Sequence, residues 1–287
     1  MVTNEDNPYE TRHPVNEELE KLEIELLLEG LYQWYGYDYR NYAYSSIRRR
    51  IWHRVQAEKL KSVSGLLEKV LHDPVCLRKL LADFSINVTE MFRDPLFFLN
   101  FREQVVPILR TYPSIRIWLA GCSTGEEVYS MAILLHEEGL YDKTKIYATD
   151  INAEVLKVAK TGTYSFNQMQ KYTNNYLQAG GKEAFSDYYS VSGNGVKFNP
   201  ELRKNVIFAQ HNLVTDRSFN EFHVILCRNV LIYFDKSLQE KVHRLFYDSL
   251  GMLGILGLGD KESIAFTELA DCYEAIAVNQ KLYKKIQ

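Results

Sequence analysis

The first third of the chain has the hydrophobic spacing of amphipathic helices. Apolar residues recur every three or four positions, which predicts helices over residues 17–35, 44–60, 64–71 and 74–84. In the first helix, the recurring positions are Leu19, Leu22, Leu26 and Leu27. Asp94 and Pro95 then place an N-cap residue before a first-turn proline, which predicts a further helix that runs to about Arg110.

After Pro113 the pattern changes to short apolar runs that alternate with helical stretches. The runs predict strands at 115–120, 145–149, 206–209 and 223–227, with 252–258 and 280–286 as the last two. The helical stretches lie at 125–138, 152–160 and 237–250. This alternation is typical of the α/β class, a mostly parallel sheet with helices on both faces.

Residues 162–204 interrupt the alternation. They are rich in Tyr, Asn, Gly and Ser, and the turn signal Ser192-Gly-Asn-Gly195 separates two β-like runs. We expect a helix and then a β-hairpin, inserted at about 165–204. The chain is thus predicted to have a flexible acidic N-terminus (1–16), a helical domain (17–93) and an α/β domain (94–287).

Composition narrows the class of protein. The 287 residues carry a net charge of -3, which hides nine acidic and two basic residues in 1–29 and seven basic and one acidic in 40–61. No apolar run reaches the length of a membrane span, and the polar start is no signal peptide. The cysteines (Cys76, Cys122, Cys227 and Cys272) form no C-x-x-C pair. We therefore expect reduced thiols, no metal site and a cytoplasmic location.

The most informative segment is I-W-L-A-G-C-S-T-G-E-E-V-Y-S at residues 117–130, a strand, a tight loop and a helix start. A phosphate-binding loop presents backbone N–H groups and often a lysine. Here the spacing is G-x-x-x-G, no lysine follows, and Glu126 and Glu127 occupy the place where phosphates would dock. Those carboxylates favour a cationic, hydroxylated ligand without phosphate, such as S-adenosylmethionine.

A second candidate position is Asp150, at the end of the next predicted strand in Tyr147-Ala-Thr-Asp-Ile-Asn152. In doubly wound sheets, an acidic residue there accepts hydrogen bonds from ribose hydroxyls. The alternative is that Asp150 only caps the helix that begins near Asn152.

Two more polar segments flank the predicted site. Cys227-Arg-Asn-Val-Leu-Ile-Tyr-Phe-Asp235 follows a strand, so Asn229 and Tyr233 are expected to face the crevice, although Tyr233 also fits a core position. Ser85-Ile-Asn-Val-Thr-Glu-Met-Phe-Arg-Asp94 precedes the α/β part. In it, Arg93 is a candidate to bind a carboxylate through two hydrogen bonds. The alternative is that this segment is a solvated helix end.

Five segments in this order resemble the CheR family, the chemotaxis-receptor glutamate methyltransferases: S-I-N-V-T-E-M-F-R-D, W-L-A-G-C-S-T-G-E-E-V-Y-S, A-T-D-I-N, H-N-L and C-R-N-V-L-I-Y-F-D. The resemblance covers roughly residues 35–265. It implies a helical N-terminal domain, then a Rossmann-like class I S-adenosylmethionine methyltransferase domain with a small inserted β-subdomain. It also implies methyl transfer to glutamates on the cytoplasmic helices of chemoreceptors, with S-adenosylhomocysteine as product.

The resemblance carries over to particular residues. Arg93 and Tyr233 are expected to flank the reacting carboxylate. The cofactor is expected to lie against Asn87, Thr89, Arg93, Ala120, Gly121, Glu127, Asp150, Asn212, Leu213, Asn229 and Val230. Of the two loop carboxylates, Glu127 is favoured for direct contact, because Glu126 could serve only as a favourable negative charge at the helix start.

A basic stripe, Arg48-Arg-Arg-Ile-Trp-His-Arg54, lies in the second predicted helix. On a helical projection Arg50, Arg54 and Lys61 share a face opposite Ile47 and Ile51. In CheR relatives a similar helix meets the acidic receptor bundle, so Arg49, Arg50 and Arg54 are predicted to dock the substrate. A solvated polar face and a nucleic-acid site are the alternatives, and the negative total charge argues against the latter.

The chain departs from the family pattern at two places. Gly259-Asp-Lys-Glu262 stands where members commonly have G-H-S-E, and Asn175-Tyr-Leu177 stands where many have R-Y-F. No glycine-rich loop suited to holding a receptor-tail peptide is clear at 192–195, which argues against such tethering. The alternatives to a receptor methyltransferase are an enzyme for another protein or small molecule, and a cofactor-binding interaction module. We expect a monomer that neither binds nucleic acid nor inserts into a membrane.

Overall fold

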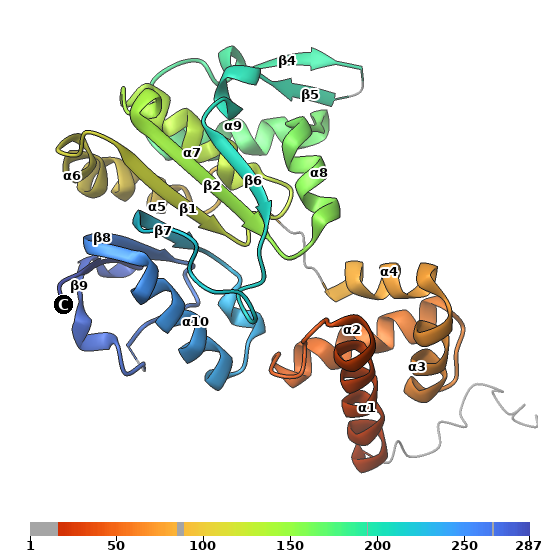
Figure 1. Ribbon diagram of the computed structural model, residues 1–287. Helices are drawn as coiled ribbons and strands as arrows, with labels where there is room; N and C mark the ends of the chain where they lie inside the picture. The colour runs from red at the N-terminus through yellow and green to blue at the C-terminus, as the bar shows by residue number, and fades with distance from the viewer. Residues whose placement is uncertain (1–16, 85–88, 194, 266) are drawn as a thin grey trace, which may run out of the picture. The chain divides into compact units, whose positions relative to one another are not determined.

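The computed structural model describes residues 17–84, 89–193, 195–265 and 267–287 (Figure 1). The chain divides into two units, Met1–Phe84 and Ser85–Gln287. The sequence placed this boundary after Arg93, but Met91 and Phe92 are fully buried in the core of the second unit. The predicted flexible N-terminus at 1–16 and the candidate Asn87 lie outside the described residues.

The first unit consists of four helices over its described part: α1 (Glu17–Tyr35), α2 (Tyr44–Ala57), α3 (Val63–His72) and α4 (Pro74–Phe84). All four match predicted segments. The α1 helix, however, buries Ile24, Leu27 and Leu31 and leaves Leu19, Leu22 and Leu26 about half exposed. Most of the positions that marked this helix in the sequence are therefore not the positions that build its core.

The second unit is built on a mixed sheet with the strand order β6-β2-β1-β7-β8-β10-β9. The first five strands run parallel, whereas β10 is antiparallel to both of its neighbours. The bounds are β1 (Ile115–Ala120), β2 (Thr144–Asp150), β6 (Val206–Gln210), β7 (Phe222–Cys227), β8 (Leu250–Leu258), β9 (Tyr273–Ala277) and β10 (Leu282–Lys285). Strand order reverses between β1 and β7, and ligands of open α/β sheets bind beside such a point.

Helices cover both faces of this sheet, as predicted. Ile117 and Leu119 of β1 belong to the core cluster that also contains α5, α6 and α7, whereas Trp118 packs against Phe246 of α10 on the other face. The helices are α5 (Pro95–Asn100), α6 (Val106–Arg110), α7 (Glu126–Glu137), α8 (Ala153–Thr161), α9 (Met169–Gln178) and α10 (Lys236–Ser249), with a π-helical turn η1 (Phe101–Val105) between α5 and α6. The 3₁₀ turns are η2 (Tyr141–Lys143), η3 (Phe166–Gln168), η4 (Phe185–Tyr188), η5 (Pro200–Arg203), η6 (Leu231–Tyr233), η7 (Ala270–Cys272) and η8 (Val278–Gln280).

The insertion forms a small antiparallel sheet beside the main one (Figure 1). Its order is β3-β5-β4, from β3 (Thr163–Ser165), β4 (Tyr189–Ser192) and β5 (Gly195–Phe198). The predicted helix and hairpin are α9 and β4–β5, and β3 completes the sheet. A side chain at Gly195 would lie 2.5 Å from the carbonyl oxygen of Tyr164, so only glycine fits there.

A buried ion-pair cluster connects the insertion to the main body. The Arg102 guanidinium pairs with Glu137 and Glu138, and its Nε donates to the carbonyl oxygen of Ala179 at 3.0 Å. Glu137 also accepts hydrogen bonds from the hydroxyls of Tyr176 and Tyr188. Because these groups are almost fully buried, each depends on the others for compensation of its desolvation.

We expect Arg102→Met to destabilise the α/β unit by about 3–5 kcal/mol, because it leaves the buried Glu137 carboxylate without its cation and removes one of the cations of Glu138. Hydrogen exchange of α/β peptides in increasing urea measures this change. Arg110→Met is the matched control: Arg110 also pairs with Glu138, but its side chain is 54% exposed, so its loss should cost under about 1 kcal/mol. Equal losses in the two variants would contradict the role of the cluster.

Candidate active site

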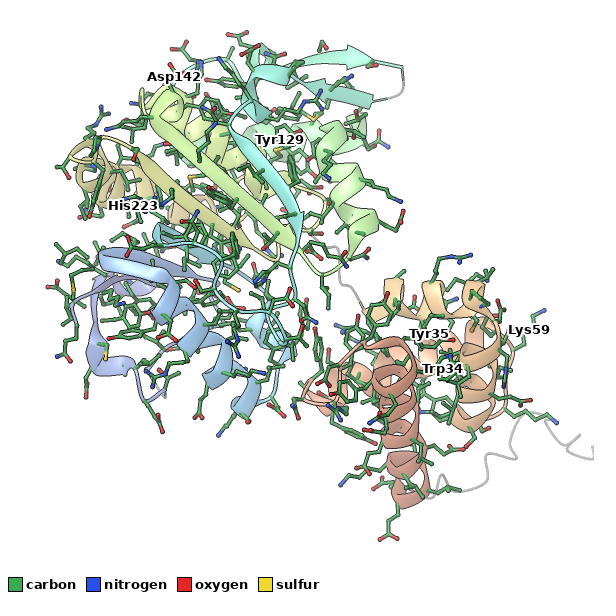
Figure 2. All side chains as sticks on the ribbon, in the orientation of Figure 1. Trp34, Tyr35, Lys59, Tyr129, Asp142 and His223 are labelled. Carbon is green, nitrogen blue, oxygen red and sulfur yellow. The ribbon has the colours of Figure 1, made fainter. Side chains whose placement is uncertain are left out.

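Most of the predicted cofactor residues lie at or just after the carboxyl ends of β1, β2, β6 and β7. The backbone N–H groups of Gly121 and Cys122 both donate to the carbonyl oxygen of Thr149 at 2.8 Å. The N–H of His211 donates to the carbonyl oxygen of Asp150 at 3.1 Å. The loops after β1 and β6 are therefore fixed to the end of β2. In Figure 2, Asp142 and His223 mark the opposite, amino-terminal edge, near the starts of β2 and β7.

Gly121 brings the loops after β1 and β7 into contact. Its φ is +78°, and a Cβ there would lie 2.4 Å from Cγ2 of Val230. Any larger residue would push the two loops apart, so glycine is required on both grounds. The structure therefore brings together Ala120, Gly121 and Val230, three of the predicted cofactor positions.

The Asp150 carboxylate organises the turn around itself. Its two oxygens accept hydrogen bonds at 2.9 Å from the N–H groups of Ser123 and Asn152. Burial raises the pKa of this carboxyl, and these backbone donors oppose the rise. The side chain that caps α8 belongs to Asn152, whose Oδ1 accepts from the N–H of Glu154. The capping alternative for Asp150 is therefore wrong, and its carboxylate remains a candidate acceptor for ribose hydroxyls.

The two loop carboxylates have different environments. Glu126 is 6% exposed and accepts a hydrogen bond from the Thr124 hydroxyl at 2.7 Å, and burial raises its pKa to about 7. Glu126 begins α7, as the sequence suggested, but its side chain is buried there. Glu127 accepts a hydrogen bond from Nη1 of Arg228 at 2.8 Å. A cofactor that contacted Glu127 would therefore contact a carboxylate that is already paired with Arg228.

Arg228 also fixes the segment that contains Arg93. Its Nη2 donates to the carbonyl oxygen of Arg93 at 3.0 Å and to the carboxylate of Asp94 at 2.7 Å. Asp94 was expected to cap α5, but it makes no such bond and pairs with Arg228 instead. The backbone of Arg93, the proposed carboxylate clamp, is therefore held by an arginine that follows β7.

Four residues around this edge adopt left-handed backbone conformations without being glycine. They are Phe92, Asp94, Ser123 and Asn229, with φ between 49° and 62°. Such residues are uncommon and concentrate at functional sites, where the surrounding structure compensates the strain. The N–H of Phe92, for example, donates to the Ser130 hydroxyl at 2.8 Å.

Glu262 is a site residue whose role the sequence did not reveal. Its buried carboxylate accepts hydrogen bonds of 2.6–3.0 Å from four backbone N–H groups, those of Asn229, Val230, Leu231 and Gly259. It is the last residue of Gly259-Asp-Lys-Glu262, so the chain departs from the family motif at the two inner positions and keeps the carboxylate that shapes the loop. The final glutamate of the family motif G-H-S-E was the feature of the sequence that could have indicated this role.

The other predicted residues have less direct contacts. Oδ1 of Asn212 accepts from the N–H of Val214 at 2.9 Å, in a turn that also buries Leu213. Tyr233 is half-buried in η6 and its N–H donates to the carbonyl oxygen of Val230 at 3.1 Å. Thr89 is half-buried just before the Arg93 segment. All the described catalytic and cofactor candidates therefore belong to the second unit, and their roles remain predictions.

The basic stripe of α2 is largely neutralised within the first unit. Arg50 is 5% exposed and donates to the carbonyl oxygen of Phe84, so its prediction as part of a solvent-facing side is wrong. Arg54 pairs with Asp83 at 2.7 Å and with Glu58 at 3.3 Å. Arg48 pairs with the buried Glu20. Arg49 is the exposed arginine among the three predicted docking residues.

These features define a class of protein. The sheet order, the glycine loop without a phosphate-binding lysine, and Asp150 with acceptor oxygens at the end of β2 fit S-adenosylmethionine. The Gly121 turn brings this loop into close contact with Val230 of the loop after β7, where a Cβ would not fit. The chain has the Rossmann-like fold of class I methyltransferases that use this cofactor. None of the described helices combines the length and the apolar character needed to cross a membrane.

The chain belongs to the CheR methyltransferase family. Residues 87–279 match the CheR methyltransferase SAM-binding domain, and residues 22–85 match the CheR methyltransferase all-alpha domain. A putative methyltransferase Cher3 of Pseudomonas putida is 50% identical over 264 residues, which cover 92% of this chain and 97% of that protein. A chemotaxis protein methyltransferase of Listeria innocua is 31% identical over 231 residues, or 80% and 85% of the two chains. The structure of the plantazolicin methyltransferase BpumL is 10% identical, with a TM-score of 0.37, over 74% of this chain and 61% of that one.

The raised pKa of Glu126 leads to a pH prediction. The folded carboxyl keeps its proton up to about pH 7, whereas the unfolded one loses it near its ordinary value of 4.5. The folded state is therefore destabilised by about 3 kcal/mol as pH rises through this window. Glu126→Gln does not titrate, so it should match the wild type near pH 4.5 and exceed its stability by up to about 3 kcal/mol at pH 8.

Urea unfolding at several pH values measures this difference. Glu154→Gln, at an exposed carboxylate of α8 that pairs with Lys157, is the control and should change stability by less than about 0.5 kcal/mol at any pH. A Glu126→Gln difference that does not change with pH would contradict the prediction.

Proposed function

We propose that this chain transfers the methyl group of S-adenosylmethionine to glutamate carboxylates on the cytoplasmic helices of chemoreceptors, and that it forms glutamate methyl esters as a monomer. The observation that carries the proposal is the fixed position of Arg93. Arg228 holds its backbone, and the left-handed residues Phe92 and Asp94 flank it. A planar guanidinium carried on this fixed backbone suits a carboxylate, which it can hold with two hydrogen bonds. The relatives named chemotaxis protein methyltransferase support the same substrate class.

The chemistry requires orientation more than activation. A glutamate carboxyl has an ordinary pKa of about 4.3, so it is ionised at pH 7 and needs no general base. One carboxylate oxygen bonds to the methyl carbon as the carbon–sulfur bond breaks, and the electron pair goes to the sulfur. No proton moves in this step. Correct placement of two reactants can lower a barrier by roughly 7–11 kcal/mol.

Arg93 and Tyr233 are proposed to position the carboxylate without exchanging a proton. The cofactor supplies the electrophilic methyl group when bound, and we assign its ribose to Asp150 and its surroundings to the loops after β1, β6 and β7. Burial raises the pKa of the Cys122 and Cys227 thiols well above the ordinary value, so both stay protonated and are poor nucleophiles. This favours direct transfer to the substrate over a cysteine intermediate.

Receptor docking is the other part of the proposal. Arg50 is buried and Arg54 is paired inside the first unit, so contact with an acidic receptor helix is assigned to the exposed Arg49. One favourable charge at an exposed site contributes modestly, which is consistent with a transient encounter.

Methyl-labelled cofactor tests the proposed substrate. The protein is incubated with the cofactor and with membranes from its own organism, and the proteins are separated and treated with mild base. We expect base-labile label on a receptor-sized band, because methyl esters hydrolyse in base. Base-stable label, or no label despite tight cofactor binding, would overturn the assignment to receptor glutamates.

Substitution of the two proposed positioning residues should lower kcat/KM by different amounts. We expect Arg93→Ala to lower kcat/KM by about 100-fold or more, because it removes a charged group at the reacting centre. Tyr233→Phe removes one neutral hydrogen bond and should cost less than about tenfold. Arg93→Lys keeps the charge without the planar fork and should fall between them. A steep rate change with a group that titrates near pH 7 would instead indicate a catalytic base.

A further inference from the structure

A pocket lies beside the proposed site, at the carboxyl ends of β7 and β8. Its volume is about 320 Å³, and it is formed where the start of α5 meets Arg228, the end of β8 and the η8 turn. All of its lining belongs to the second unit. Asp94 lines it and follows Arg93 directly in the chain, so a group bound in this pocket would lie next to the segment that we propose clamps the reacting carboxylate.

The pocket combines apolar walls with acidic groups. Leu96, Phe97 and Leu258 supply the walls, and Leu96 is 57% exposed. Asp94 and Asp260 supply the acidic groups. Apolar surface beside carboxylates fits a side chain with a methylene stem and a positively charged end, because such chains bury the stem and keep the charge near its partners.

The charge balance of the pocket is negative. The Arg228 guanidinium is already paired with both Glu127 and Asp94. Asp260 is exposed, and its carboxylate has no hydrogen-bond or ion-pair partner among the described residues. An entering cation would therefore find one uncompensated carboxylate and a second that shares its cation.

Arg228 provides an independent indication that the ligand is polar. Its side chain is 1% exposed, and its Nε has no hydrogen-bond partner in the described part of the chain. Arg228 lines the pocket, and a buried donor without an acceptor is costly, so a carbonyl oxygen that reached Nε would be stabilised there. A peptide supplies both the carbonyl oxygen and the basic side chain.

We infer that this pocket binds an arginine or lysine side chain of the protein substrate, next to the carboxylate that receives the methyl group. The inference rests on the proposed function for the assumption that the substrate is a protein. Asp260 determines the specificity, since it provides the uncompensated charge. It occupies a position at which the chain departs from the family motif G-H-S-E.

Binding of small probes to the full-length chain tests the inference without methyl transfer. N-acetyl-arginine amide and N-acetyl-citrulline amide have nearly the same shape, but the second has no charge. We expect the arginine probe to bind about fivefold more tightly in an NMR titration, as one exposed ion pair allows, and to shift the signals of Asp260 and its neighbours. Equal binding of the two probes, or no binding of either, would overturn the inference.

Two variants separate this pocket from general surface charge. Asp260→Asn should remove most of the preference for the arginine probe. Asp142→Asn removes an exposed carboxylate at the amino-terminal edge of the sheet and should keep the full preference (Figure 2). Asp94 is left unchanged because its loss would break the ion pair with Arg228. The same loss of preference in both variants would overturn the assignment to Asp260.

Saturation with S-adenosylhomocysteine separates the pocket from the cofactor site. We expect the arginine probe to bind equally well in its presence, whereas mutual exclusion would assign the pocket to the cofactor and overturn the inference. The failure of the proposed function has a different signature. If the arginine probe binds as expected but receptors from the membranes receive no methyl ester, the inference about the pocket is supported and the assignment of receptors as substrate is wrong.

Discussion

The buried guanidinium of Arg228 is the interaction on which the site depends. A fully desolvated charge is tolerated only where acceptors surround it, and here they come from segments far apart in the sequence. Glu127 belongs to α7, whereas Asp94 and the carbonyl oxygen of Arg93 precede α5. The guanidinium also lies 4.1 Å from the centre of the Phe97 ring. The backbone of Arg93 is therefore held by the Arg228 charge and lies outside any helix or strand.

Glu262 plays the complementary part as a buried anion. Four backbone N–H groups converge on its carboxylate, which compensates both its own desolvation and the left-handed conformation of Asn229. One buried cation and one buried anion thus hold the loop after β7 from two directions. Since that loop also contacts Gly121 through Val230, both charges affect the shape of the proposed cofactor site.

The sequence predicted the fold well because its signals are local. The four helices of the first unit, the parallel strands and the inserted hairpin all follow from hydrophobic period and turn residues. The edge strand β9 was missed because Tyr273-Glu-Ala-Ile-Ala277 is short and has weak alternation. Burial was predicted less well, since it depends on partners: Arg50 is buried by α4, and Leu19 is exposed despite its spacing. The bond of Asp94 to Arg228 is long-range, so no local pattern indicated it, and for Glu262 the family motif marked the position but not its four backbone donors.

The distribution of charge indicates where substrate selection takes place. On α2, Arg48 pairs with Glu20, and Arg54 pairs with Asp83 and Glu58, all within the first unit. Charges that are paired at short range contribute little to a long-range field, and salt screens the rest. In the second unit, by contrast, Asp260 has no partner among the described residues and lies in a pocket beside the Arg93 segment. If the proposed function holds, we expect a substrate to be selected more by the residues that flank its reacting carboxylate than by general attraction to a basic helix.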